Sequence, residues 1–272
     1  MKIRAYRSAV LLILAAALVV LPVGAKAEMY VEAYLGGNFP GSSSFGYGAS
    51  PAPGYAYTVS APGNFDPAVI GGLKIGTWFV KEGVLGFNYP EWMKYLGFYV
   101  DFSYHRLNLR HQAAHYRENY LGSQFQGVWN LDTNGHAATL AFMFAGRYGF
   151  LPDSEVPFGR LQPYVAVGPA IMFTSQAPTF NFASYTGPYL TDSQDLHSQS
   201  ATVLALAVEA GLRWMALKNV SLDASFKYRY AVPSYSYLVD PGGNGFFLQR
   251  HSMTMDQTLN LFSFQVGAAY HF

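Results

Sequence analysis

The fold of this chain is decided by its last fourteen residues, Leu259-Asn-Leu-Phe-Ser-Phe-Gln-Val-Gly-Ala-Ala-Tyr-His-Phe272. Every second residue from Phe262 to Phe272 is apolar, whereas the residues between them, such as Ser263 and Gln265, are small or polar. This period of two predicts a β-strand with two different faces. Large aromatic side chains on one face and small, mostly uncharged side chains on the other are typical of a transmembrane β-barrel, which has lipid outside and a polar interior.

Seven other segments show the same alternation, at residues 29–38, 68–79, 96–107, 136–150, 163–174, 202–216 and 220–230. With 259–272 they predict an all-β fold, an eight-stranded antiparallel transmembrane β-barrel, and the even number of strands fits a bacterial barrel. The connections alternate in length. Those at 39–67, 108–135, 175–201 and 231–258 are predicted as long outer loops, and those at 80–95, 151–162 and 217–219 as shorter periplasmic turns, with a short helix at 90–94.

The amino terminus has the pattern of a secretory signal peptide. Lys2, Arg4 and Arg7 precede an apolar run at 9–21, and Ala25-Lys26-Ala27 fits an A-x-A cleavage site. The apolar run is shorter than the ~20 residues that a membrane-spanning helix needs. We therefore predict a signal peptide at 1–27 and an outer-membrane β-barrel domain at 28–272.

Composition narrows the class further. Removal of residues 1–27 takes away four of the 17 basic residues and none of the 16 acidic ones, so the mature chain has a formal charge of −3. That charge does not indicate a nucleic-acid partner, which calls for a basic stripe. The chain has no cysteine, which excludes disulfides and thiolate metal sites. Charged residues make up only 12% against the roughly 25% of a soluble domain, as expected for a wall that faces hydrocarbon.

With these strands and an aromatic carboxyl-terminal residue, the chain resembles small bacterial outer-membrane barrels of the OmpA, OmpW and opacity type. The resemblance implies a location in the outer membrane of a Gram-negative bacterium, exposed at the cell surface. It implies outer-membrane lipid, lipopolysaccharide and the barrel-assembly machinery as partners, and leaves the surface ligand unidentified. It also implies that the last strand is the assembly signal, through Phe264, Val266, Ala268, Tyr270 and Phe272.

Charged residues of the predicted strands fall almost entirely at inward positions. An eight-stranded barrel encloses an interior that side chains can fill, so these charges must be paired. One interpretation is a closed lumen, and the alternative is a narrow path for ions. The predicted network consists of Glu32, Lys74, Asp101, Arg147, Glu209, Arg213, Asp223, Lys227 and Arg229.

The hairpin of the sixth and seventh strands allows a prediction of register. Inward residues are odd-numbered in both strands, so opposed residues must have numbers with an even sum. A three-residue turn at 217–219 would pair Ala216 with Val220. That register sets Arg213 opposite Asp223 and Glu209 opposite Lys227.

Candidate catalytic and metal-binding residues are sparse. His197-Ser198 and His251-Ser252, with Asp192, Asp195 and Asp256 nearby in sequence, lie in predicted outer loops, but adjacent residues of an extended chain point in opposite directions. His111 and His115 could share a metal ion only if their segment were helical. We expect no catalytic, metal or cofactor site.

The sequence thus predicts a membrane-spanning structural or interaction scaffold that displays its outer loops at the cell surface. The first alternative is a narrow channel for ions or small apolar solutes. The second is an enzyme that modifies lipid A.

Overall fold

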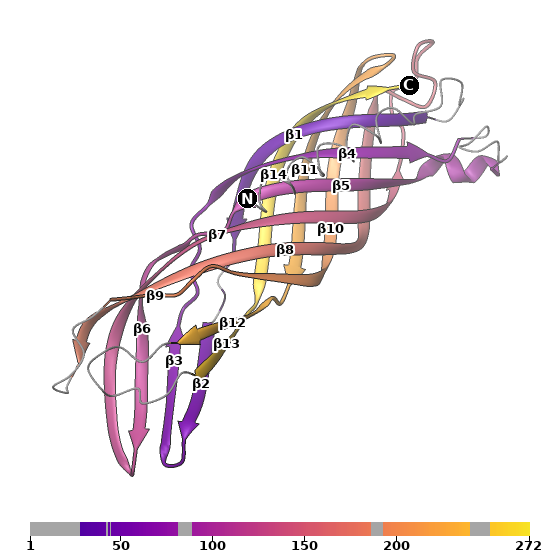
Figure 1. Cartoon of the computed structure of the whole chain (residues 1–272). Coiled ribbons are helices and arrows are strands. Elements are labelled where there is room, and N and C mark those ends of the chain that lie inside the picture. The colour runs from indigo at the N-terminus through magenta and orange to yellow at the C-terminus, as the bar shows by residue number, and fades with distance from the viewer. Residues whose placement is uncertain (1–27, 42, 44, 81–88, 186–192, 240–250) are drawn as a thin grey trace, which may run out of the picture.

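The chain forms a closed β-barrel that continues beyond one end as an extended sheet (Figure 1). The computed structural model describes residues 28–41, 43, 45–80, 89–185, 193–239 and 251–272, so the predicted signal peptide lies outside the described residues. Each strand of the wall pairs antiparallel with the next, and β14 closes the barrel by pairing with β1. The predicted eight-stranded barrel is confirmed. Its wall consists, in spatial order, of β1 (Glu28–Pro40), β4 (Ala68–Trp78), β5 (Leu96–Arg106), β7 (Ser123–Arg147), β8 (Leu161–Tyr185), β10 (Gln199–Leu217), β11 (Val220–Ala231) and β14 (Leu259–His271).

The strands are strongly tilted. A row of paired residues that starts at Thr202 on β10 returns to β10 at Leu212, ten residues further along the strand. At a rise of ~3.3 Å per residue and a strand spacing of ~4.8 Å, this offset corresponds to a tilt of about 40°. An eight-stranded barrel at this tilt has room inside for side chains only. The row runs through Thr202, Phe173, Ala138, Tyr104, Gly71, Leu35, Val266, Ala224 and Leu212.

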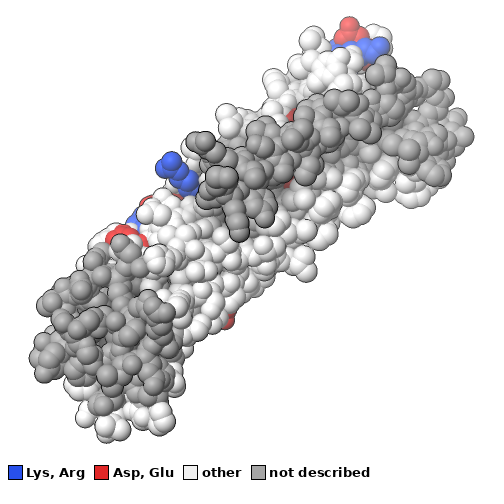
Figure 2. Space-filling view, viewed as in Figure 1, with Lys and Arg blue, Asp and Glu red and all other residues white. Residues whose placement is uncertain are grey.

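The two faces of the wall are those predicted. Outward side chains such as Leu35, Phe144 and Val266 are exposed, while inward ones such as Glu32 and Lys227 are buried. On the face shown in Figure 2, most of the described surface is free of charge, and only a few charged side chains reach it. An apolar outside around a polar inside is the arrangement of a barrel that crosses a membrane.

The register of the β10–β11 hairpin is confirmed, but its turn is different. Arg213 faces Asp223 and Glu209 faces Lys227. The predicted pair of Ala216 with Val220 is wrong, because Leu217 pairs with Val220 and the register shifts between Met215 and Leu217. The turn is therefore one residue shorter than predicted. A β-bulge at this register shift compensates for the missing residue, so the odd-numbered residues of both strands still point inward. The Arg160 guanidinium supports this bulge by donating to the carbonyl oxygens of Met215 (3.1 Å) and Ala216 (3.3 Å).

Most of the described residues in the predicted long outer loops form paired strands that extend the sheet beyond the barrel. Strand β7 pairs with β6 through its first half, and β3 and β2 continue the sheet (Figure 1). Two of the outer pairs are local hairpins, β2 with β3 and β6 with β7, whereas β3 with β6 and β13 with β2 join segments far apart in the sequence. The β2–β3 hairpin was not predicted because its Gly, Ser and Pro residues favour turns when taken alone. We call this part the outer extension. It contains β2 (Phe45–Ala52), β3 (Tyr55–Ala61), β6 (Leu109–Tyr120), β9 (Ser193–Asp195), β12 (Ser234–Val239), β13 (His251–Gln257) and the outer halves of β7 and β8.

The opposite end of the barrel carries short connections. A 3-10 helix, η2 (Glu91–Tyr95), precedes β5 close to the predicted short helix. In the turn between β7 and β8, the Asp153 carboxylate accepts hydrogen bonds from the backbone N–H of Val156 (2.8 Å) and Glu155 (2.9 Å) and pairs with Arg160. None of the described helices is long and apolar enough to span a membrane.

Candidate functional site in the lumen and on the outer extension

The inward charges form one chain of alternating sign across the lumen. Lys74 Nζ lies 2.8 Å from Glu32 and 2.7 Å from Glu209. Arg213 bonds to the other oxygen of Glu32 at 2.6 Å and to Asp223 at 3.3 Å. All five side chains are buried. Each cation therefore has two carboxylate partners, as a buried charge requires.

The chain extends in the other direction from Glu209. Lys227 Nζ lies 3.0 Å from Glu209 and also pairs with Asp101. The complete order is Asp223, Arg213, Glu32, Lys74, Glu209, Lys227, Asp101, and we call these residues the lumen network. They come from β1, β4, β5, β10 and β11, so the network ties together strands that are not neighbours in the wall.

Three tyrosines occupy the remaining acceptor positions of the carboxylates. Tyr34 donates to Asp101 (2.6 Å), Tyr99 donates to Glu209 (3.0 Å), and Tyr164 lies 2.8 Å from both Glu209 and Asp223. Two of these large rings need a glycine on the neighbouring strand. A Cβ at Gly211 would come within 2.6 Å of the Tyr164 ring, and one at Gly72 would meet the Tyr34 hydroxyl at 2.3 Å.

The two other predicted members of the network lie outside the chain of ion pairs. Arg229 is buried and donates to Asn38 (2.9 Å) and Ser103 (3.2 Å). Arg147 lies near the periplasmic end, where it pairs with Glu28, donates to Gln162 (3.0 Å), and has its guanidinium 4.1 Å from the ring centroid of Trp78.

Sequence analysis missed Glu28 because this residue directly follows the predicted cleavage site. Side chains alternate between the two faces of a strand, so the even-numbered Glu28 is expected to point inward like Glu32 and Tyr34. This alternation could have identified Glu28 as a residue of the lumen.

Apolar side chains fill the interior beyond the lumen network on the outer side. Leu107, Leu131, Met172 and Leu261 are fully buried, and the Tyr235 and Tyr237 rings of β12 pack in the same core. Tyr235 donates to Thr174 on β8 (2.7 Å), which fixes β12 across the interior. In the described residues, two successive layers therefore occupy the lumen, one of ion pairs and one of apolar side chains.

The predicted catalytic and metal candidates do not assemble into a site among the described residues. The Ser198 hydroxyl lies 2.8 Å from Ser175, and the Ser252 hydroxyl lies 2.9 Å from Ser236, so each serine bonds to another serine. His111 and His115 lie on strand β6 and not on a helix, and His111 Nδ1 contacts Asp132 at 3.0 Å. Within the described ranges, no three His, Cys, Asp or Glu side chains come close enough to hold a metal ion.

The other residues singled out in the sequence lie on outer strands or on the last strand of the barrel wall. Asp195 and Asp256 lie on β9 and β13, while Asp192 lies outside the described residues. The residues of the predicted assembly signal alternate along β14, and Phe264, Val266, Tyr270 and Phe272 point outward.

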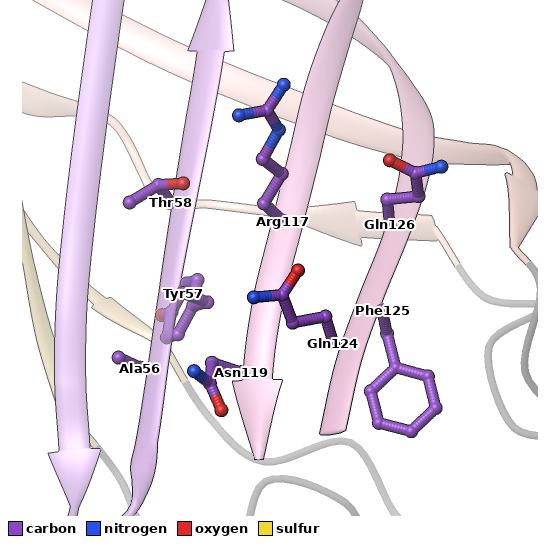
Figure 3. Close-up of a pocket in the computed structure, with 8 residues that line it drawn as sticks. All are labelled: Ala56, Tyr57, Thr58, Arg117, Asn119, Gln124, Phe125 and Gln126. Carbon is purple, nitrogen blue, oxygen red and sulfur yellow. The ribbon is translucent and has the colours of Figure 1, made fainter. Parts of the chain in front are cut away.

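The outer extension presents a polar face with a pocket of about 610 Å³ (Figure 3). Thr58, Arg117 and Gln126 lie side by side on β3, β6 and β7, because the register pairs Thr58 with Arg117 and Arg117 with Gln126. The next row consists of Ala56, Asn119 and Gln124. The pocket thus combines hydroxyl, amide and guanidinium groups on a hydrogen-bonded sheet.

A closed barrel with an apolar wall and a polar interior defines the class: the protein is a transmembrane β-barrel of the outer-membrane type. No family model and no curated protein matches the chain.

Solved structures show a general resemblance. The outer membrane protein OprG from Pseudomonas aeruginosa is 15% identical, with 90% of this chain and 96% of that one covered and a TM-score of 0.47. A major outer membrane protein from Thermus thermophilus is 12% identical over 91% and 100%, with a TM-score of 0.44. The outer membrane protease OmpT from Escherichia coli is 9% identical over 90% and 97%, with a TM-score of 0.39. At such identities and TM-scores below 0.5, the resemblance assigns no function.

Proposed function

We propose that this protein is a closed membrane-spanning scaffold that holds a rigid binding surface outside the cell. The observation that carries the proposal is the filling of the lumen by two layers. A channel needs a path for its solute, whereas here the carboxylates of the lumen network are engaged by Lys74, Arg213 and Lys227. Apolar side chains such as Leu107 and Leu131 then close the interior above them.

The outer extension supports the second half of the proposal. Its strands are paired along their length, so Thr58, Arg117 and Gln126 are held by backbone hydrogen bonds and not by a loose loop. Amide groups both donate and accept hydrogen bonds, and a guanidinium binds a carboxylate through two parallel bonds. This combination suits a polar oligosaccharide with an acidic group.

Two measurements test the two halves. The purified barrel in planar bilayers should give no conductance steps, and steady single-channel currents would refute the closed lumen. The detergent-solubilised protein should bind acidic oligosaccharides on a glycan array, and Arg117→Ala should lose that binding. Arg160→Ala is the matched control, because Arg160 lies in a turn at the other end of the barrel. An array without binding by the unmodified protein, or with equal binding by Arg117→Ala, would contradict the proposed surface.

A further inference from the structure

An arginine on the outside of the barrel marks the outer edge of the membrane. Along β5 the outward side chains Phe102 and Tyr104 are followed by Arg106, which pairs in the register with His136 on β7. Tyr104 is 49% exposed and Val69 beside it is 75% exposed, so both face the lipid. Aromatic rings prefer the headgroup level, and Arg106 therefore lies where the headgroups of the outer leaflet begin.

A groove of about 610 Å³ lies at this position between β4 and β5. Its lower wall is apolar and consists of Ala68, Val69 and Tyr104, whereas its upper wall carries Asp66 and Arg106. The groove thus has the polarity of a lipid molecule, with hydrocarbon towards the membrane and charge towards water.

The charges of the groove leave one cation without a counter-ion. Arg110 donates to the Asp66 carboxylate at 3.2 Å, so that acid already has a basic partner. The Arg106 guanidinium has neither a hydrogen bond nor an ion pair within the part of the chain that the structure describes.

We propose that this groove binds a phosphorylated lipid of the outer leaflet, with a lipid A phosphate on Arg106 and an acyl chain along Val69 and Tyr104. A guanidinium binds phosphate through two parallel charge-assisted hydrogen bonds, and a cation near an anionic membrane surface gains affinity for it. The inference is independent of the proposed function, because the groove lies on the lipid-facing wall and not in the lumen or on the sheet face around Arg117.

Native mass spectrometry of the detergent-purified barrel tests the proposal, with lipid A and with lipid A stripped of its phosphates as probes. The barrel should retain lipid A and bind the stripped lipid about five- to tenfold more weakly. Arg106→Gln should lower retention of lipid A by the same factor and leave the stripped lipid unchanged, while Arg106→Lys should recover part of the difference. Lys218→Gln, which removes an exposed cation at the opposite rim, is the matched control and should change nothing.

Equal retention by Arg106→Gln and the unmodified barrel would overturn the proposal, as would equal binding of the two lipids. Displacement of lipid A by millimolar inorganic phosphate would also overturn it, because the apolar wall of Val69 and Tyr104 would then contribute nothing. Heat-modifiable mobility on gels verifies that each variant is folded before its lipid binding is compared.

Discussion

Substitution of Glu209 tests the lumen network most directly. Its two carboxylate oxygens accept from Lys74 (2.7 Å), Lys227 (3.0 Å), Tyr99 (3.0 Å) and Tyr164 (2.8 Å). Breaking a buried ion pair costs about 3–5 kcal/mol when it leaves an unpaired charge. Each lysine keeps one other carboxylate, Glu32 or Asp101, so the ionic loss in Glu209→Ala should be near the lower limit, about 3 kcal/mol.

The tyrosines add to this value. Tyr164 keeps Asp223 as an acceptor, whereas Tyr99 loses the carboxylate to which it donates. A buried hydroxyl without an acceptor costs about 1 kcal/mol or more, so we expect Glu209→Ala to lower the free energy of unfolding by about 4 kcal/mol. The assay is urea unfolding of the barrel refolded into short-chain lipid bilayers, followed by tryptophan fluorescence. Glu91→Ala on exposed η2 is the matched control and should stay within about 0.5 kcal/mol.

A second substitution separates lost ion pairs from lost packing. Lys74→Met in the Glu209→Ala background removes the cation between Glu32 and Glu209 and returns the lumen network to its original net charge of −1. The remaining pairs, Arg213 with Glu32 and Lys227 with Asp101, stay intact. The double variant should be more stable than the sum of the single effects by about 1–3 kcal/mol. Strict additivity, or a loss below about 1 kcal/mol in Glu209→Ala, would refute the claim that the ion pairs stabilise the barrel.

Three other predictions follow from the wall, the topology and the periplasmic turn. Val208→Arg places a charge on the lipid face and should cost about 2–4 kcal/mol in the same unfolding assay, and a tolerance equal to that of Val208→Ile would contradict the facing. On intact cells, a membrane-impermeant maleimide should label a cysteine at position 58 (Thr58→Cys) but not one at position 218 (Lys218→Cys). Labelling at position 218 would show that the topology is the reverse of the one described. The Val156 N–H and the Arg160 guanidinium hold the pKa of the Asp153 carboxyl below its ordinary value, so this carboxylate stabilises the turn above a pH of about 4 and ceases to do so as pH falls through the lowered pKa. Asp153→Asn should therefore speed hydrogen exchange at the Val156 amide at pH 7, by a factor that shrinks as pH falls below about 4, and a factor that stays constant over this range would contradict this account.

The facing of the wall strands and the β10–β11 register could be predicted because two constraints coincide there. Alternation fixes which residues point inward, and the cost of an unpaired buried charge then selects the register that sets Arg213 opposite Asp223. The partners across the lumen were not predictable in this way. Glu32 and Lys74 oppose each other on neighbouring strands, but Arg213 and Glu209 reach them from β10, and such contacts depend on the tilt and offset of the closed barrel.

The outer extension escaped prediction because its local hairpins, β2 with β3 and β6 with β7, are assembled into one sheet by pairings between distant segments. Strand β13 pairs with β2 and β3 with β6, and residues such as Gly46 and Gly48 on β2 favour turns when taken alone. A signal was nevertheless present in β12, where buried Tyr235 and Tyr237 alternate with exposed serines. The turn of the β10–β11 hairpin also escaped prediction, since its bulge receives hydrogen bonds from Arg160, which lies in a separate turn.

Strand β7 shows why one alternating pattern suits both the membrane and the water outside it. Odd-numbered residues of β7 point inward from Trp129 to Arg147. Within the membrane the outward residues are apolar, such as Phe142 and Phe144; beyond His136 they are Asn130, Asp132 and Asn134. Beyond the membrane the inward residues include the large apolar Trp129 and Leu131, because a sheet surrounded by water needs an apolar interior, whereas the wall surrounded by lipid can place Arg147 inside. Since the parity never changes, β7 crosses the membrane boundary without a break in its pairing with β8, and the buried apolar side chains of the outer extension continue into the apolar layer above the lumen network.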